Sequence, residues 1–146
     1  NMEKLINSMK VAFASEYSFY LKSHNYHWNV TGINFPQYHQ LFDMIYTEVY
    51  ENIDDFAENI RKLKSFVPGS FEKFSLLSKI QDETEIPNAE QMLQTLLDDS
   101  QKMIKLLKIC FDLATENGEE GLADFLAGRM DAHQKHSWMM RATLGQ

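Results

Sequence analysis

Apolar side chains recur at steps of three and four residues along most of the chain, which is the pattern of amphipathic α-helices. Turn sequences such as Val67-Pro68-Gly69 and Asn117-Gly118 separate the periodic stretches. The pattern predicts four long helices, over residues 2–29, 34–65, 88–116 and 119–144. A short helix is expected over residues 70–80, inside the connection between the second and third long helices.

Four helices of this length favour an all-α four-helix bundle. The 146 residues are enough for one domain, residues 1–146, with a single hydrophobic core. The connection before the third long helix is longer than a hairpin needs, so we expect a long crossover that carries the short helix.

The composition and net charge of the chain disfavour some classes of function. The formal net charge of −7 disfavours non-specific binding to nucleic acid, which needs clustered lysine and arginine, and suits the attraction of cations. The single cysteine, Cys110, cannot form an intrachain disulfide. Since no secretory leader pattern or membrane-spanning apolar run is present, we expect a cytoplasmic protein.

The second predicted helix carries an unusual set of polar residues. His39 and Asp43 are four residues apart, as are Asp54 and Glu58, so each pair shares one helix face. All four positions fall within an arc of roughly 100°. Asp43 and Asp54, however, lie about 16 Å apart along the axis. One metal ion therefore cannot bind both pairs of a single helix.

Two arrangements remain open for these pairs. Each pair could belong to a separate site, or two antiparallel copies of the helix could bring His39 and Asp43 of one chain opposite Asp54 and Glu58 of another. His27 is a further candidate ligand near the end of the first helix. Imidazoles with carboxylates suit iron(II), although zinc or copper could also bind. From the spacing alone, a solvated acidic face and structural histidines are favoured over a metal site.

A larger set of residues matches one family signature in order and in spacing. These residues are His24-Asn25-Tyr26-His27-Trp28-Asn29-Val30, Gly32, Asn34, Phe35, His39, Asp43, Asp54 and Glu58. They resemble the signature of the DNA-protection-during-starvation (Dps) proteins, which are mini-ferritins. Residues 136–142 are similar to the last helix of that family, so the resemblance covers nearly the whole chain.

The resemblance implies a ferritin-like bundle that assembles into a hollow shell of twelve subunits. Iron would bind between two-fold-related subunits, with His27, His39 and Asp43 from one chain and Asp54 and Glu58 from its neighbour. Members of the family are ferroxidases that oxidise iron(II), usually with hydrogen peroxide rather than dioxygen. They store the ferric product and so protect the cell from oxidative damage. Zinc is a possible substitute at such a site.

Further residues outside this ligand set can also be assigned expected roles. Trp28 either accepts an oxidising equivalent near the site or is a core aromatic residue. Asp124 and Asp131 would line three-fold pores for iron entry, or belong to a solvated face. The three remaining histidines are expected to be structural: His24, His133 and His136.

The two alternatives to a shared iron site are a DNA-coating protein and a ferritin-like protein with a diiron centre inside one bundle. Many family members bind DNA through a lysine-rich N-terminal extension, whereas only Lys4 and Lys10 precede residue 20 here, so we expect weak or absent DNA binding. A DNA-coating nucleoid protein with a structural role is the alternative, which the acidic charge disfavours. A diiron centre inside one bundle would need Glu-x-x-His on two helices, a pattern that is missing from the sequence.

Overall fold

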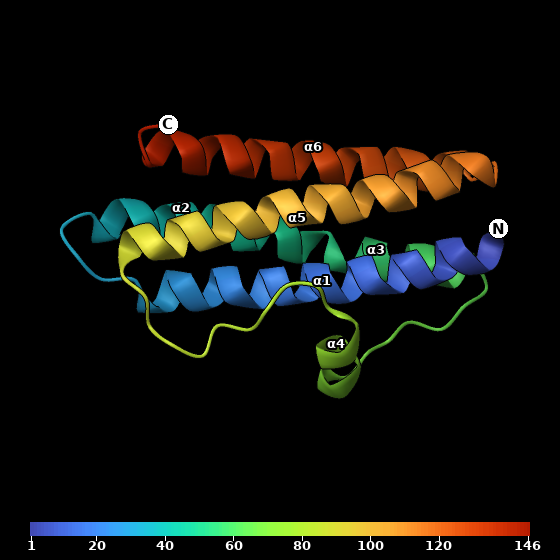
Figure 1. Ribbon diagram of the computed structural model, residues 1–146, viewed down its shortest axis with the longest axis horizontal. Helices are drawn as coiled ribbons and strands as arrows, with labels where there is room; N and C mark the ends of the chain where they lie inside the picture. Colours follow the sequence, from blue (N-terminus) through green and yellow to red (C-terminus); the bar gives the residue numbers. More distant parts are fainter.

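The protein is a bundle of long helices with a crossover segment on its outside (Figure 1). The computed structural model describes residues 1–146 and contains helices but no strands. The helices are α1 (Met2–Asn29), α2 (Phe35–Glu51), α3 (Ile53–Lys62), α4 (Phe71–Leu77), α5 (Ala89–Glu116) and α6 (Glu120–Thr143). The predicted all-α, four-helix bundle with a short helix in the long connection is confirmed.

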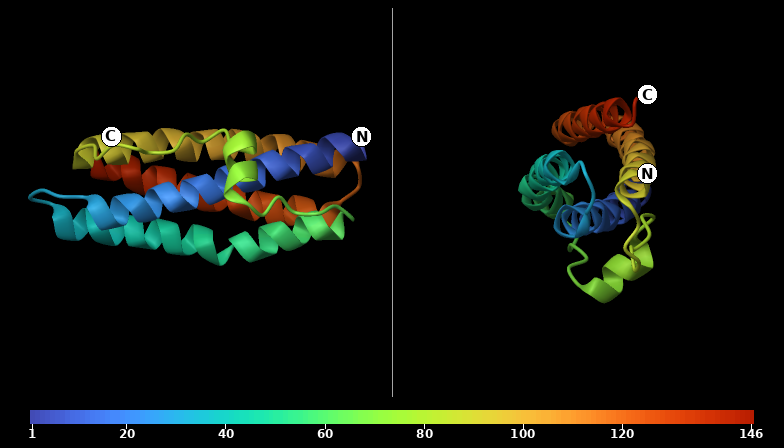
Figure 2. Two further views of the ribbon diagram at one scale, coloured as in Figure 1. Left: turned by 90° about the horizontal axis from the view of Figure 1, so that it is seen from below. Right: turned by 90° about the vertical axis from the view of Figure 1, so that its left-hand side faces the viewer.

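The second long helix is interrupted at Asn52, where the sequence predicts an unbroken helix over residues 34–65. The backbone N–H of Asn52 bonds to the carbonyl of Val49, three residues back, at 3.1 Å. Its side-chain amide donates to the carbonyl oxygen of Glu48 at 2.9 Å. An asparagine side chain that competes for backbone groups in this way interrupts the regular ladder. Therefore α3 continues α2 after a bend (Figure 2).

The ends of α5 follow from capping chemistry. The Asn88 side chain accepts a hydrogen bond from the backbone N–H of Gln91 at 2.9 Å, and the Gln91 side chain accepts one from the N–H of Asn88 at 3.1 Å. This reciprocal capping box starts the helix. Gly118 has a φ of +71°, a left-handed conformation that glycine adopts without strain, and it ends the helix.

The core lies between α1, α2, α3, α5 and α6, and α4 packs on the outside of α1. Phe56 of α3 makes edge contacts with Phe13 of α1 and Phe125 of α6, with ring centroids 5.7 and 5.6 Å apart. Phe74 of α4 stacks on Tyr17 of α1 at 4.5 Å. These contacts hold the crossover against the bundle. None of the helices is long and apolar enough to span a membrane.

A cluster of charged groups lies within this apolar bundle, and it is buried except for Glu48, whose side chain is 33 % exposed. Glu16 of α1 and Glu48 of α2 each bond an imidazole of α6, His133 at 2.7 Å and His136 at 2.8 Å respectively. The Arg129 guanidinium contacts both carboxylates. Three helices are thereby tied together by charged groups, and both histidines occupy the buried positions that a structural role requires.

Candidate metal centre

His27 and His39 form the first part of the candidate site. The short loop between α1 and α2 brings their rings together, stacked at 3.8 Å with 14° between the planes. Each ring donates its Nδ1–H to the other residue's backbone carbonyl, His27 at 2.8 Å and His39 at 2.7 Å. Because Nδ1 carries the proton in the neutral ring, Nε2 of each imidazole has a free lone pair. Both Nε2 atoms are thus available to accept a hydrogen bond or bind a cation.

Asp43 adds a carboxylate beside this pair. One Asp43 carboxylate oxygen lies 3.8 Å from Nε2 of His27. The Asp43 side chain is about half exposed, whereas His27 is mostly buried. The other carboxylate oxygen accepts a long hydrogen bond of 3.4 Å from Thr47. The carboxylate therefore faces solvent and can accept a cation from one side.

A second set of carboxylates lies on the first turns of α3. Ligand oxygens of Asp54, Asp55 and Glu58 lie within 4.8 Å of one another, and all three residues are exposed. The positive end of the α3 dipole favours the two aspartates in the first turn. Asp55 was not among the residues predicted from the sequence, although it lies three residues before Glu58 and so close to it on the helix.

The chain therefore presents two separate groups of ligands, which we call the histidine set (His27, His39 and Asp43) and the carboxylate set (Asp54, Asp55 and Glu58). The bend at Asn52 lies between them, and the helical rise separates Asp43 from Asp54 by about 16 Å. Metal–ligand bonds of about 2 to 2.5 Å cannot join groups so far apart. The two sets of a single chain therefore cannot bind the same metal ion.

Aromatic side chains adjoin the histidine set. The His24 ring stacks on Tyr46 at 3.8 Å and lies 4.0 Å from the Trp28 ring. Burial lowers the pKa of His24, and the neighbouring His27 lowers it further. Trp28 is 58 % exposed, so the structure does not support the alternative that it is a core residue of the chain.

An acidic hollow lies between α3 and the start of α6. It has a volume of about 470 Å³, and Asp55, Glu119 and Asp124 are among its lining residues. Asp124 and Asp131 are exposed on α6. Carboxylates in a shared hollow attract cations from solution. The hollow adjoins the carboxylate set through Asp55.

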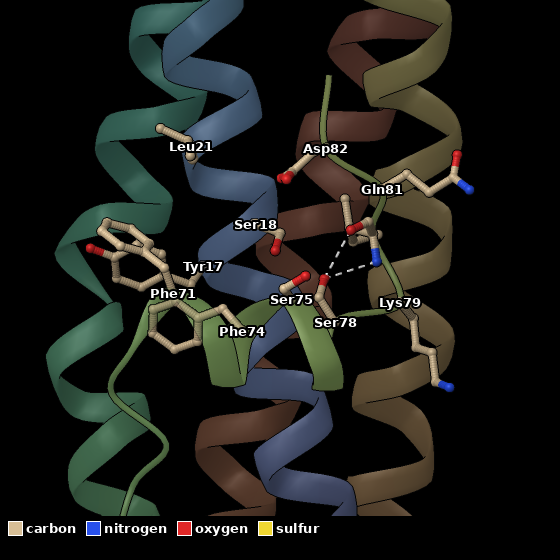
Figure 3. A pocket seen from close by; sticks show the side chains of 11 residues that line it. Tyr17, Ser18, Leu21, Phe71, Phe74, Ser75, Ser78, Lys79, Gln81 and Asp82 are labelled. Carbon is tan, nitrogen blue, oxygen red and sulfur yellow. Dashed lines mark hydrogen bonds between the residues drawn. The ribbon is translucent and has the colours of Figure 1, made fainter. Parts of the chain in front are cut away.

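A separate groove runs between α1 and the crossover (Figure 3). Its volume is also about 470 Å³, and Tyr17, Phe71 and Phe74 line one end of it. Lys79 and Asp82 are the charged residues that line it. Since one carboxylate cannot form a metal site by itself, the candidate chemistry lies with the two ligand sets and not in this groove.

Comparison with known proteins identifies the family. The family model for the ferritin-like domain matches residues 6–146. DNA protection during starvation protein 2 of Bacillus anthracis is 32 % identical over 127 residues, which cover 87 % of each chain. The chain belongs to the Dps family. The predicted family is thus confirmed.

Solved Dps structures share the fold of this Dps chain. Dps from Thermosynechococcus elongatus superposes with a TM-score of 0.95 at 25 % identity, covering 99 % of this chain and 92 % of the other. A Dps protein from Vibrio cholerae gives a TM-score of 0.93 at 29 % identity and covers 98 % and 90 %. The metal-binding roles of the individual side chains remain predictions.

Proposed function

We propose that this Dps chain is a ferroxidase that oxidises iron(II) and stores the ferric product inside a homo-oligomeric shell of twelve subunits. The observation that supports it is the division of the ligands into two separate sets, one where α1 meets α2 and the other on the first turns of α3. Two antiparallel copies of α2 and α3 would place the histidine set of one subunit opposite the carboxylate set of the other. A two-fold axis would then create two equal sites at each interface.

The chemistry of the ligands supports iron as the substrate. Neutral imidazoles and carboxylates with open positions suit iron(II), and the V. cholerae Dps protein is described as a member of a broad superfamily of ferritin-like diiron-carboxylate proteins. Asp54 and Glu58 would bind the first iron, because two anionic ligands offset its charge. His27, His39 and Asp43 would complete the site. Zinc would compete for the same ligands.

Hydrogen peroxide is the proposed oxidant. Two iron(II) ions supply the two electrons that reduce one peroxide molecule, and with two protons the products are two iron(III) ions and two water molecules. The exposed position of the carboxylate set lets iron and oxidant reach the site from solution. The acidic hollow with Asp124 would supply iron by attracting cations.

DNA coating is the weaker candidate for this chain. The net charge of −7 disfavours binding to the negatively charged phosphate backbone of DNA at physiological salt.

We propose that iron oxidation takes place in the cytoplasm, where a free thiol such as Cys110 stays reduced. In this proposal protection of the cell comes from the consumption of iron(II) and peroxide together.

Subunit mixing tests whether each site is shared between chains. One variant, Asp54→Asn with Glu58→Gln, keeps the whole histidine set but only Asp55 of the carboxylate set. A second variant, His39→Ala with Asp43→Asn, keeps the whole carboxylate set but only His27 of the histidine set. Each variant alone should oxidise iron(II) no faster than buffer. Random assembly of equal amounts should restore about one quarter of the sites, because half of the interfaces are mixed and each mixed interface has one complete site.

The readout is ferric absorbance after addition of hydrogen peroxide to anaerobic iron(II), together with retention of iron on the assembled protein. Glu90→Gln, the same change at an exposed glutamate of α5, is the matched control and should retain the full rate. An inactive mixture would show that the two sets do not combine across subunits. Wild-type protein that oxidises iron no faster than buffer would refute the proposed function itself.

A further inference from the structure

The junction between α2 and α3 lies between the two ligand sets, at Asn52. In an unbroken helix the backbone N–H of residue 52 would bond to the carbonyl of Glu48, four residues back. Here that N–H bonds to the carbonyl of Val49 instead, and the Asn52 side-chain amide bonds to the Glu48 carbonyl at 2.9 Å. The same amide also donates to Oε2 of the Glu48 carboxylate at 3.0 Å. Both the backbone and the side chain of Glu48 therefore hold the junction.

The Glu48 carboxylate is held in turn by α6. Its Oε1 accepts hydrogen bonds from Nε2 of His136 at 2.8 Å and from Nη2 of Arg129 at 3.1 Å. Its Oε2 accepts one from Nη1 of Arg129, in addition to the bond from Asn52. A guanidinium that binds both oxygens of a carboxylate fixes its orientation as well as its distance. Because Arg129 also contacts Glu16 of α1, the junction is tied to α1 and α6.

The direction of α3 after the junction determines where its carboxylates lie. Glu58 is six residues beyond Asn52, which is about 9 Å along the axis at 1.5 Å per residue. A change of about 20° in the bend, the size of a helix kink, would move that position sideways by about 3 Å. Metal–ligand distances vary by only about 0.2 Å, so such a change would remove a ligand from the site. In the proposed dimer it would do so at both sites of the interface.

We propose that Asn52 and Glu48 are positioning residues of the metal centre, which set the bend between α2 and α3 and thereby the position of the carboxylate set relative to the histidine set. This inference rests on the shared metal site of the proposed function. Neither residue would bind the metal ion, because both act through the direction of α3. This role links the charged cluster within the bundle to the ligand sets on its surface.

Asn52→Ala tests this role, because alanine favours an unbroken helix and removes both side-chain bonds to Glu48. The assembled protein is titrated with cobalt(II), whose d–d absorption reports the ligands and their geometry. Equilibrium dialysis gives the affinity and the number of sites. We expect the variant to bind cobalt(II) about tenfold more weakly than the wild type, which is the usual effect of losing a residue that orients metal ligands. The absorption spectrum of the bound cobalt(II) should change as well.

Asn117→Ala is the matched control. The Asn117 side-chain amide bonds to the carbonyl of Leu113, four residues back, at 2.7 Å. The substitution therefore removes the same kind of bond at the end of α5, outside both ligand sets. This variant should keep the cobalt(II) affinity and spectrum of the wild type. A general loss of stability would instead weaken binding in both variants.

A second variant tests whether Glu48 acts through the same bend as Asn52. Glu48→Gln keeps the length of the side chain but replaces one acceptor oxygen with an amide group, so it should also weaken cobalt(II) binding. If both residues act on one bend, the double variant should bind cobalt(II) no more weakly than Asn52→Ala alone. Losses that add in the double variant would overturn the assignment of Glu48.

The remaining outcomes separate this inference from the proposed function. Wild-type affinity and spectrum in Asn52→Ala would overturn the inference, as would an equal loss of affinity in Asn52→Ala and Asn117→Ala. Iron(II) oxidation is measured on the same wild-type sample. Wild-type protein that binds cobalt(II) but does not oxidise iron(II) would refute the ferroxidase function and leave the positioning role intact. Wild-type protein that does not bind cobalt(II) would refute both.

Discussion

The replacement of Arg129 by methionine tests the role of the buried charged cluster. Only 3 % of the Arg129 side chain is exposed, and its guanidinium contacts Glu16 at 3.5 Å and Glu48 at two atoms. Methionine has a similar length but no charge and no donors. The variant would leave the two carboxylates without a guanidinium partner, bonded to His133, His136 and the Asn52 side-chain amide.

The expected loss of stability follows from the cost of an uncompensated buried charge. Removal of one partner from a buried ion pair costs about 3 to 5 kcal/mol. One kcal/mol corresponds to about 2 to 4 °C in the unfolding temperature of a domain of this size. We therefore expect Arg129→Met to unfold about 10 °C below the wild type at pH 7 and at equal subunit concentration.

The pH dependence gives the prediction a second readout. Burial raises the pKa of Glu48, but hydrogen bonds from His136 and Arg129 outweigh this effect and lower that pKa to about 2. A carboxyl whose pKa is lower in the folded than in the unfolded state stabilises the fold above the unfolded pKa. This stabilisation is lost as the pH falls from about 4.5 to about 2. In Arg129→Met the Glu48 pKa should rise, so the difference from wild type should shrink below about pH 4.5.

Thermal unfolding followed by circular dichroism at pH 7 and pH 4 measures both effects. Arg141→Met, the same substitution near the end of α6 and outside the cluster, is the control and should shift the midpoint little. A midpoint for Arg129→Met equal to that of the control at pH 7 would refute the electrostatic reasoning. A large loss that is the same at both pH values would point to packing rather than charge.

Three further predictions concern other parts of the chain. Asn88→Ala removes one half of the capping box and should lower the free energy of unfolding by about 1 kcal/mol in a denaturant titration. Burial raises the pKa of Cys110 to about 12, so iodoacetamide at pH 8 should alkylate it only after denaturation, as mass spectrometry would show. Asp124→Asn with Asp131→Asn should slow iron uptake into the assembled protein but leave its helix content unchanged; normal uptake would indicate another entry route.

The helices could be predicted from the sequence because their ends carry local signals. Asn88 and Gly118 set the ends of α5 by chemistry that involves only neighbouring residues. The break at Asn52 could not be predicted, because asparagine is tolerated inside helices. It depends on a side-chain bond to Glu48, and the Glu48 carboxylate is itself bonded to Arg129, 81 residues away.

The candidate site was predictable to the extent that each pair of ligands lies within one helix. The pairs His39 with Asp43 and Asp54 with Glu58 follow from a spacing of four residues. The rings of His27 and His39 each bond the backbone carbonyl of the other residue. These bonds join two helices through tertiary structure, so the helical periodicity of the sequence does not indicate them.

The buried cluster explains why metal chemistry is expected on the surface of this bundle rather than inside it. The sequence lacks the Glu-x-x-His pattern of an internal diiron centre, yet the structure gathers two glutamates and two histidines at the bundle centre. There the Arg129 guanidinium already contacts both carboxylates, and each carboxylate also accepts a bond from an imidazole. A divalent cation would have to displace a buried positive charge, whereas the histidine and carboxylate sets offer free ligand atoms to solvent. In the proposed dimer, a second copy of the chain would bring its carboxylate set to the histidine set of the first.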